Sequence, residues 1–423
     1  MKPKSTNHFF ENPESPRLSK ILNPRHELYI LAEMIEWEEF EEAFGALYSE
    51  GNSRPPKPIR LMVGLLMLQH MYGFSDEGVV KRWAENPYWQ FFCGFDVLQW
   101  QFPIDPSSLS RFRNRVGEEG MEKILSETIK MAIQHKVISI KDLKDVIVDT
   151  TVMEKNITHP TDAKLYFKLR EKLIRKAKKL NIPLRQSYTF VAKKALINVS
   201  RYAHARQMKR AKKKTKILRT YLRRVYADIR RKTAEDEILK KEFSHLFKLV
   251  DRLLYQNKES KSKLYSLHAP EVECISKGKA HKKYEFGCKV SLVVTHKQGL
   301  ALSCRAFHGN PYDGHTLKDA LLDAEKLSSA KIERAFLDKG YKGHKITDKK
   351  VYISGQKRGV TASIKRLIKR RSAIEPHIGH LKQEGKMGRN FLKGTIGDTM
   401  NALLCGVGHN LRLILRHFMP QFA

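Results

Sequence analysis

The stretch Asp145-Val146-Ile147-Val148-Asp149-Thr150-Thr151-Val152 is where the character of this sequence changes. Upstream, from about residue 28 to residue 135, apolar residues recur at helical spacing. The stretch itself is a short run rich in β-branched residues, which is typical of a strand, and we expect that strand to end at Asp149. The chain is thus predicted to begin with an all-helical region, residues 1–140, and to enter a sheet at this point.

The strands and helices predicted farther along the chain complete a mixed sheet. Alternating residues indicate two strands joined by Gln298-Gly299, a pair that suits a tight hairpin. The predicted elements are strands at 286–294 and 300–307, a helix at 315–327, strands at 334–338 and 351–354, helical segments over 363–382, and an amphipathic helix over 402–418. This order predicts an α/β fold with an RNase H-like mixed sheet flanked by helices, in which the first and fourth strands are neighbours.

A large insertion separates the first predicted strand from the second. Residues 164–232 hold 25 Lys and Arg against two acids, so they carry +23 of the formal charge of +35. The insertion is not a disordered tail, because apolar residues recur at helical spacing over 217–229 and again over 239–254. We expect a bundle or hairpin of helices at 163–258, inserted into a sheet domain formed by residues 141–162 and 259–423.

The composition limits the class of protein and its compartment. An apolar fraction of 41% with 9% aromatic residues is enough for hydrophobic cores, which argues against wholesale disorder. Five scattered cysteines form no C-x-x-C pair and suit a reducing cytosol. The longest apolar stretch, residues 61–68, is too short to span a bilayer. We expect a cytoplasmic protein without a membrane partner.

The charge of +35 indicates an anionic partner, and nucleic acid is the first candidate. The alternative is a generally basic protein, although the uneven distribution of charge argues against it. On a predicted helix after Pro106, Arg111 and Arg115 share one side and could enter a DNA groove; a solvated face of a packed helix is an equal alternative. The candidate DNA-binding residues are Arg111, Arg113, Arg115, Lys209, Arg210, Lys212, Lys213, Lys214 and Lys216.

Two predicted strands end in an aspartate, Asp149 on the first and Asp338 on the fourth. If these strands are neighbours, both carboxylates emerge together. A strand-end aspartate is costly to bury without a counter-charge. A hard dication such as Mg²⁺, with Mn²⁺ as a substitute, is the natural partner of clustered carboxylates. Either aspartate alone is better explained as an N-cap or turn residue, so the prediction of a metal site depends on the pair.

Glu375 is the candidate third carboxylate. Lys382, seven residues on, and Arg371, four residues back, lie close to the same helix face at about 100° per residue. Glu384 is nine residues on, roughly half a turn round the helix, so we expect it to point away. Pro376 makes Glu375 the effective start of a helix or else kinks a longer one. The alternative for Arg371 and Glu375 is a simple i, i+4 surface pair.

Together these blocks resemble the bacterial insertion-sequence transposases of the DDE superfamily, in the branch related to the Insertion Sequence 5 group and to the Insertion Sequence 4 group. The resemblance rests on residues 148–152, on residues 336–343, and on Arg371, Glu375 and Lys382, whose spacing is similar to the family's Y-x2-R-x3-E-x6-K signature. Residues 58–115 also resemble the helical N-terminal region of this family. Ile368 stands where the signature has Tyr, and some relatives carry their insertion between the second Asp and the Glu instead.

The resemblance implies a fold, a reaction and a set of roles. The reaction is phosphoryl transfer, in which water cleaves a transposon end and the freed 3′-OH then joins target DNA. It implies two metal ions about 3.5–4 Å apart, with Asp149 bridging both, Asp338 holding one and Glu375 the other. Lys382 would bind phosphate, and Arg371 would bind phosphate or orient Glu375.

The same resemblance implies double-stranded DNA partners, namely the terminal inverted repeats and the target DNA, and a homodimer on DNA. It also implies a bacterial protein that is associated with the nucleoid when bound to DNA. Two alternatives to a transposase remain open. One is an RNase H-like nuclease that cleaves without joining strands. The other is a catalytically inactive, basic nucleic-acid-binding protein.

Overall fold

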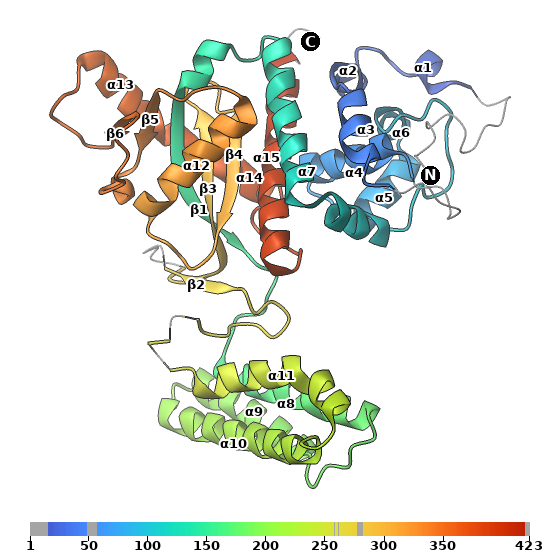
Figure 1. The fold of residues 1–423 in the computed structure, drawn as a ribbon, viewed down its shortest axis with the longest axis vertical. Coiled ribbons are helices and arrows are strands. Elements are labelled where there is room, and N and C mark those ends of the chain that lie inside the picture. The colour runs from blue at the N-terminus through green and yellow to red at the C-terminus, as the bar shows by residue number, and fades with distance from the viewer. Residues whose placement is uncertain (1–15, 49–56, 258, 261, 277–281, 419–423) are drawn as a thin grey trace. The chain divides into compact units, whose positions relative to one another are not determined.

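The computed structural model describes residues 16–48, 57–257, 259–260, 262–276 and 282–418. The chain forms two compact units (Figure 1). The sheet unit comprises Met1–Glu154 and Cys288–Ala423, and the insertion unit comprises Lys155–Gly287. The sheet unit combines a mixed sheet with helices, which confirms the predicted α/β class.

Each unit is built from its own set of elements. The helices of the sheet unit are α1 (Leu18–Ile21), α2 (Glu27–Met34), α3 (Glu38–Gly45), α4 (Ile59–Tyr72), α5 (Asp76–Glu85), α6 (Pro87–Phe92), α7 (Ser107–Gln134), α12 (Asp313–Ser328), α13 (Ala362–Arg370), α14 (Ile374–Gln383) and α15 (Gly394–Phe418). Its strands are β1 (Asp145–Glu154), β3 (Glu285–Thr295), which begins in the insertion unit, β4 (Ala301–Phe307), β5 (Arg334–Leu337) and β6 (Lys350–Ile353). The insertion unit holds α8 (Asp162–Lys179), α9 (Thr189–His204), α10 (Met208–Lys232), α11 (Glu237–Tyr255) and β2 (Glu273–Ile275).

The strands of the sheet unit lie in the order β4-β3-β1-β5-β6. β1, β5 and β6 run parallel, whereas β3 and β4 form an antiparallel hairpin. Gly299 in that hairpin has φ +75°, a conformation that favours glycine, and its N–H donates to the Thr295 carbonyl at 3.0 Å. The pairing of β1 with β5 confirms that the first and fourth strands of the predicted sheet are neighbours.

Helices cover both faces of this sheet. Val148 and Leu337 belong to the hydrophobic core that includes α7 and α12. Ile147 and Phe336 belong to a separate core that includes α14 and part of α15. Because successive residues of a strand point to opposite faces, the sheet has an α12 face and an α14 face. This division decides which way each side chain at the strand ends points.

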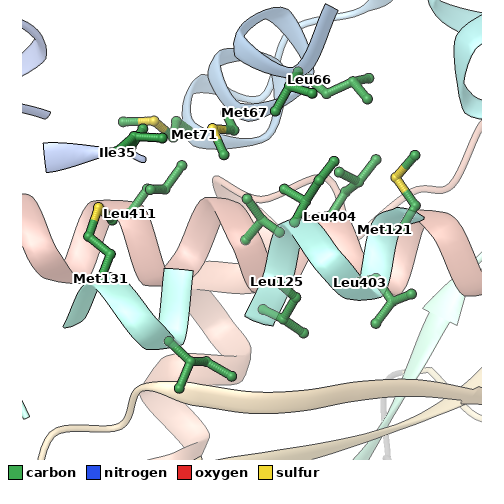
Figure 2. Close-up of a cluster of buried hydrophobic side chains, with 14 of the residues drawn as sticks. Ile35, Leu66, Met67, Met71, Met121, Leu125, Met131, Leu403, Leu404 and Leu411 are labelled. Carbon is green, nitrogen blue, oxygen red and sulfur yellow. The ribbon is translucent and has the colours of Figure 1, made fainter. Parts of the chain in front are cut away.

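The C-terminal helix α15 is an interior helix, because residues 400–411 are all buried. This corrects the prediction of an amphipathic helix for most of its length; within the predicted range 402–418, only Arg416 and His417 are exposed. One side of α15 packs on the sheet, and the other packs on α4 and α7 through Met and Leu side chains (Figure 2). At Gly408 an added Cβ would lie 2.3 Å from the His70 carbonyl oxygen, so only glycine allows this approach of α15 to α4. Arg412 donates to the carbonyls of His70 and Met71, both at 2.8 Å, near the C-terminus of α4.

The insertion unit is a helical bundle with its own core. α10 buries Leu218, Leu222, Val225 and Ile229, which confirms the predicted apolar stripe, and packs against α8 and α9. The cations of α10 lie mainly on its exposed side. Within the part of the chain that the structure describes, no helix has both the length and the apolar character needed to cross a membrane.

Candidate active site

Asp149 and Asp338 lie at matching positions, each directly after the last paired residues of β1 and β5. The parallel pairing of β1 with β5 ends at Val148 opposite Leu337, and an aspartate follows on each strand. The prediction that both strands end there needs one correction. β5 ends at Leu337, but β1 continues to Glu154 because it remains a neighbour of β3 on its other side. The two carboxylates therefore lie where β1 loses its β5 partner.

The direction of the two aspartates follows from the strand alternation. Asp149 continues the row of Ile147, and Asp338 continues the row of Phe336. Both rows face α14. The carboxylates are thus expected on the face of the sheet that α14 covers, which is where the third candidate carboxylate is located.

Arg371 connects Asp149 with Glu375. Its guanidinium lies 3.6 Å from an Asp149 carboxylate oxygen and 3.4 Å from Glu375 Oε1. The Arg371 side chain is only 13% exposed, whereas Glu375 is 65% exposed. The interaction is more than a surface i, i+4 pair, because Arg371 also supplies a counter-charge to the strand carboxylate.

Arg371 and Glu375 lie where the chain changes from a 3₁₀ turn to an α-helix. Arg371 begins a 3₁₀ turn (Arg371–Ala373) that separates α13 from α14. α14 then starts at Ile374, so Pro376 lies in its first turn, where proline is tolerated. Ile374 and Leu381 of α14 are buried, and the partly buried Ile378 packs against the same core. Lys382 is half-buried near its C-terminal end.

Glu384 belongs to a different ion cluster. It forms ion pairs with His380 at 2.9 Å and with Arg412 of α15 at 3.2 Å. Burial tends to raise the pKa of Glu384, but the hydrogen bond with His380 and the charge of Arg412 outweigh burial and lower the pKa. Glu384 therefore ties the end of α14 to α15, whereas Glu375 faces Arg371.

The structure brings further charged and polar groups to this part of the sheet that the sequence did not single out. Burial, followed by the charges of Asp149, Asp313 and Asp338, raises the pKa of the Tyr341 hydroxyl well above its usual value. Tyr341 is 1% exposed, so the hydroxyl on which these charges act lies in the interior. Lys289 on β3 is also buried and donates to Asp313 at 2.8 Å. No signal in the sequence indicated this role, because Lys289 alternates with apolar residues as a surface lysine would.

The donor chemistry of the site suits a hard divalent cation. Asp149, Asp338 and Glu375 offer only carboxylate oxygens, which Mg²⁺ and Mn²⁺ prefer. Within the described ranges, no three His, Cys, Asp or Glu side chains already form a metal-binding group. Asp149 and Glu375 are instead connected through Arg371.

The candidate DNA contacts on α7 divide into two kinds. Arg113 is 3% exposed and pairs with both carboxylate oxygens of Asp76. Its assignment as a DNA contact is thus wrong for this conformation, because the side chain is needed to neutralise Asp76 inside the protein. Arg111 and Arg115 are exposed; Arg111 donates to two serine hydroxyls at 3.1 Å, and Arg115 stacks on Tyr48. These contacts leave both guanidinium groups at the surface.

The candidate DNA contacts of the insertion unit lie at the start of α10 or within it. Lys209, Arg210, Lys212, Lys213 and Lys216 are exposed, and Lys214 is half-buried. They present a dense positive surface on the bundle.

Two family models match this chain. The model described as Transposase domain (DUF772) matches residues 16–115, and the model described as Transposase DDE domain matches residues 256–411. A relative from Rhizobium meliloti, described as Uncharacterized protein ORF8 in nfe locus, is 50% identical over 191 residues, which are 45% of this chain and 92% of the relative. No solved structure matches. The chain belongs to the DDE transposases of insertion sequences.

Proposed function

We propose that this protein is an active DNA transposase that cleaves DNA at transposon ends and transfers the 3′-OH to target DNA. The observation that supports the proposal is that Asp149 and Asp338 each directly follow a paired residue of two neighbouring parallel strands, with Glu375 connected to Asp149 by Arg371. The strand order β4-β3-β1-β5-β6, with β1 and β5 central and parallel, supports an RNase H-like arrangement of the catalytic part.

Asp149, Asp338 and Glu375 would hold the metal cofactor, which we propose to be Mg²⁺. When bound, the dication supplies Lewis-acid charge that activates the nucleophile and stabilises the leaving oxygen. Arg371 orients Asp149 and Glu375 towards each other. Lys382 is expected to bind a phosphate oxygen of the scissile strand.

The basic surface of α10 would bind the DNA backbone. Each phosphate that it neutralises steepens the salt dependence of binding by about 0.9 in log K against log salt. Such contacts position DNA without reading its sequence. Recognition of the inverted repeats is assigned to Arg111 and Arg115, and we propose a homodimer on paired ends. We also propose that the protein belongs to the branch of transposases related to the Insertion Sequence 5 group.

The test is an assay of purified protein with Mg²⁺, labelled DNA carrying the terminal repeats of the element, and a supercoiled target. A transposase yields both 3′-OH ends and labelled target. Ends without labelled target would indicate a nuclease that does not join strands. Binding without either product would indicate an inactive DNA-binding protein.

A further inference from the structure

Lys289 and Asp313 form an ion pair close to the segments that carry Asp149 and Asp338. Asp313 occupies the first position of α12, and Lys289 reaches it from β3 with Nζ 2.8 Å from Asp313 Oδ1. Lys289 also donates to the Pro311 carbonyl at 2.6 Å, and its side chain is only 9% exposed. A buried lysine needs such partners, because an isolated charge in the interior is strongly unfavourable.

Asp313 contacts the first strand directly after Asp149. The Thr150 hydroxyl donates to Asp313 Oδ1 at 3.0 Å, and Thr150 is buried. Since adjacent residues of a strand point to opposite faces, Thr150 points to the α12 face while Asp149 points to the α14 face. Asp313 is therefore placed behind Asp149 and does not share its face.

Asp313 also contacts the segment that follows Asp338. A Cβ added at Gly340 would lie 3.3 Å from Asp313 Oδ2, so this oxygen lies against the Gly340 backbone. The neighbouring Tyr312 strengthens the contact by donating its hydroxyl to the Lys342 carbonyl at 3.0 Å. The start of α12 thus packs on the 3₁₀ turn Lys339–Tyr341.

We propose that Asp313, held by Lys289, is a positioning residue that fixes the spacing of Asp149 and Asp338. One carboxylate touches the residue after the first aspartate and the turn after the second. The start of α12 favours a negative charge there, because the helix dipole is positive at its N-terminus. The inference rests on the proposed function, since the spacing matters only if the two aspartates bind a cation together.

The cleanest variant is Thr150→Val, which removes the hydroxyl and nearly keeps the shape of the side chain. We expect Mn²⁺ binding, measured by calorimetry, and the rate of DNA-end cleavage each to fall about 10–100-fold, the usual cost of removing a group that orients a metal ligand. DNA-end binding should stay at the wild-type level. Thr150→Ser restores the hydroxyl and should recover most of both losses. Asp313→Asn should give at least the loss seen with Thr150→Val.

Thr128→Val is the matched control, because Thr128 on α7 is equally buried and its hydroxyl bonds to Leu125 and Asn410. If Thr150→Val binds Mn²⁺ and cleaves at the level of Thr128→Val, the positioning role is refuted. Equal losses in Thr150→Ser and Thr150→Val would also refute it, because the hydroxyl would not be the cause. If the wild-type protein neither binds Mn²⁺ nor cleaves, the proposed function fails instead.

Discussion

The sheet unit and the insertion unit use charge in opposite ways. In the sheet unit, several charged side chains are buried against specific partners, as in Arg113 with Asp76 and Lys289 with Asp313. In the insertion unit, 25 Lys and Arg stand against two acids over residues 164–232, and many of them are exposed on a helical bundle. Paired charges hold particular side chains in position, whereas many exposed charges of one sign create a strong electrostatic potential at the surface. Single substitutions should therefore matter greatly in the first unit, and only groups of substitutions should matter in the second.

The largest effect is expected at Glu375. Glu375→Gln should slow Mg²⁺-dependent cleavage about a thousand-fold, because charge stabilisation by a bound metal contributes several kcal/mol and about 1.4 kcal/mol is tenfold in rate. Glu384→Gln is the matched control, since Glu384 pairs with Arg412 and His380. Single-turnover cleavage measures both. Loss of cleavage in Glu384→Gln but not in Glu375→Gln would reverse the assignment.

The buried pair of Arg113 and Asp76 should show the next largest effect. Arg113→Met leaves Asp76 without its counter-charge and should lower the free energy of unfolding by about 3–5 kcal/mol. Arg111→Met, on the same helix but exposed, should change it by less than about 0.5 kcal/mol. Urea unfolding distinguishes them. Equal values for the two variants would mean that Arg113 is not the interior residue described above.

Grouped neutralisation tests the insertion unit. Changing Lys212, Lys213, Lys214 and Lys216 to Gln should reduce the slope of log K against log salt by about 0.9 for each DNA phosphate that is no longer neutralised. Affinity should fall for specific and non-specific DNA alike. The control changes four exposed lysines of the sheet unit, namely Lys20, Lys136, Lys141 and Lys331. An equal reduction of this slope in the control would show that DNA binding depends on the total charge of the protein and not on the α10 surface.

The smallest expected effect concerns pH. Burial opposes ionisation of Asp142, but hydrogen bonds from Ser139 and Lys297 outweigh it and hold its pKa at about 2. Because an unfolded aspartate has a pKa of about 3.9, this stabilisation is present above that value and is lost as the pH falls towards 2. The difference is worth about 2 kcal/mol. Urea unfolding between pH 6 and 2 should show that the free energy of unfolding falls less steeply in Asp142→Asn than in the wild-type protein. Parallel curves of this free energy against pH would contradict the prediction.

The sequence predicted the features that depend on local pattern and strand order. The adjacency of Asp149 and Asp338 followed from two apolar strands and their place in the chain. The burial of individual charged side chains could not be predicted in this way, because it depends on elements that are distant in the sequence. Arg113 resembles its exposed neighbours in the sequence, and only the position of Asp76 on another helix makes it an interior residue.

The ion pair of Lys289 and Asp313 was not predicted, for a related reason. Lys289 alternates with apolar residues as a surface lysine would, but α12 covers that face of the sheet. Asp313 had the pattern of an ordinary residue at a helix start. Likewise, the polar residues of α15 suggested an exposed side, although the N-terminal helices cover it.

The most direct test of the reaction centre compares wild-type protein with Asp149→Ala in one assay of DNA-end binding and strand transfer with Mg²⁺. We predict equal affinity of both proteins for the transposon end, with joined product from the wild-type protein and none from Asp149→Ala. Joined product from Asp149→Ala at the wild-type rate would contradict the assignment of the strand carboxylates as the reaction centre.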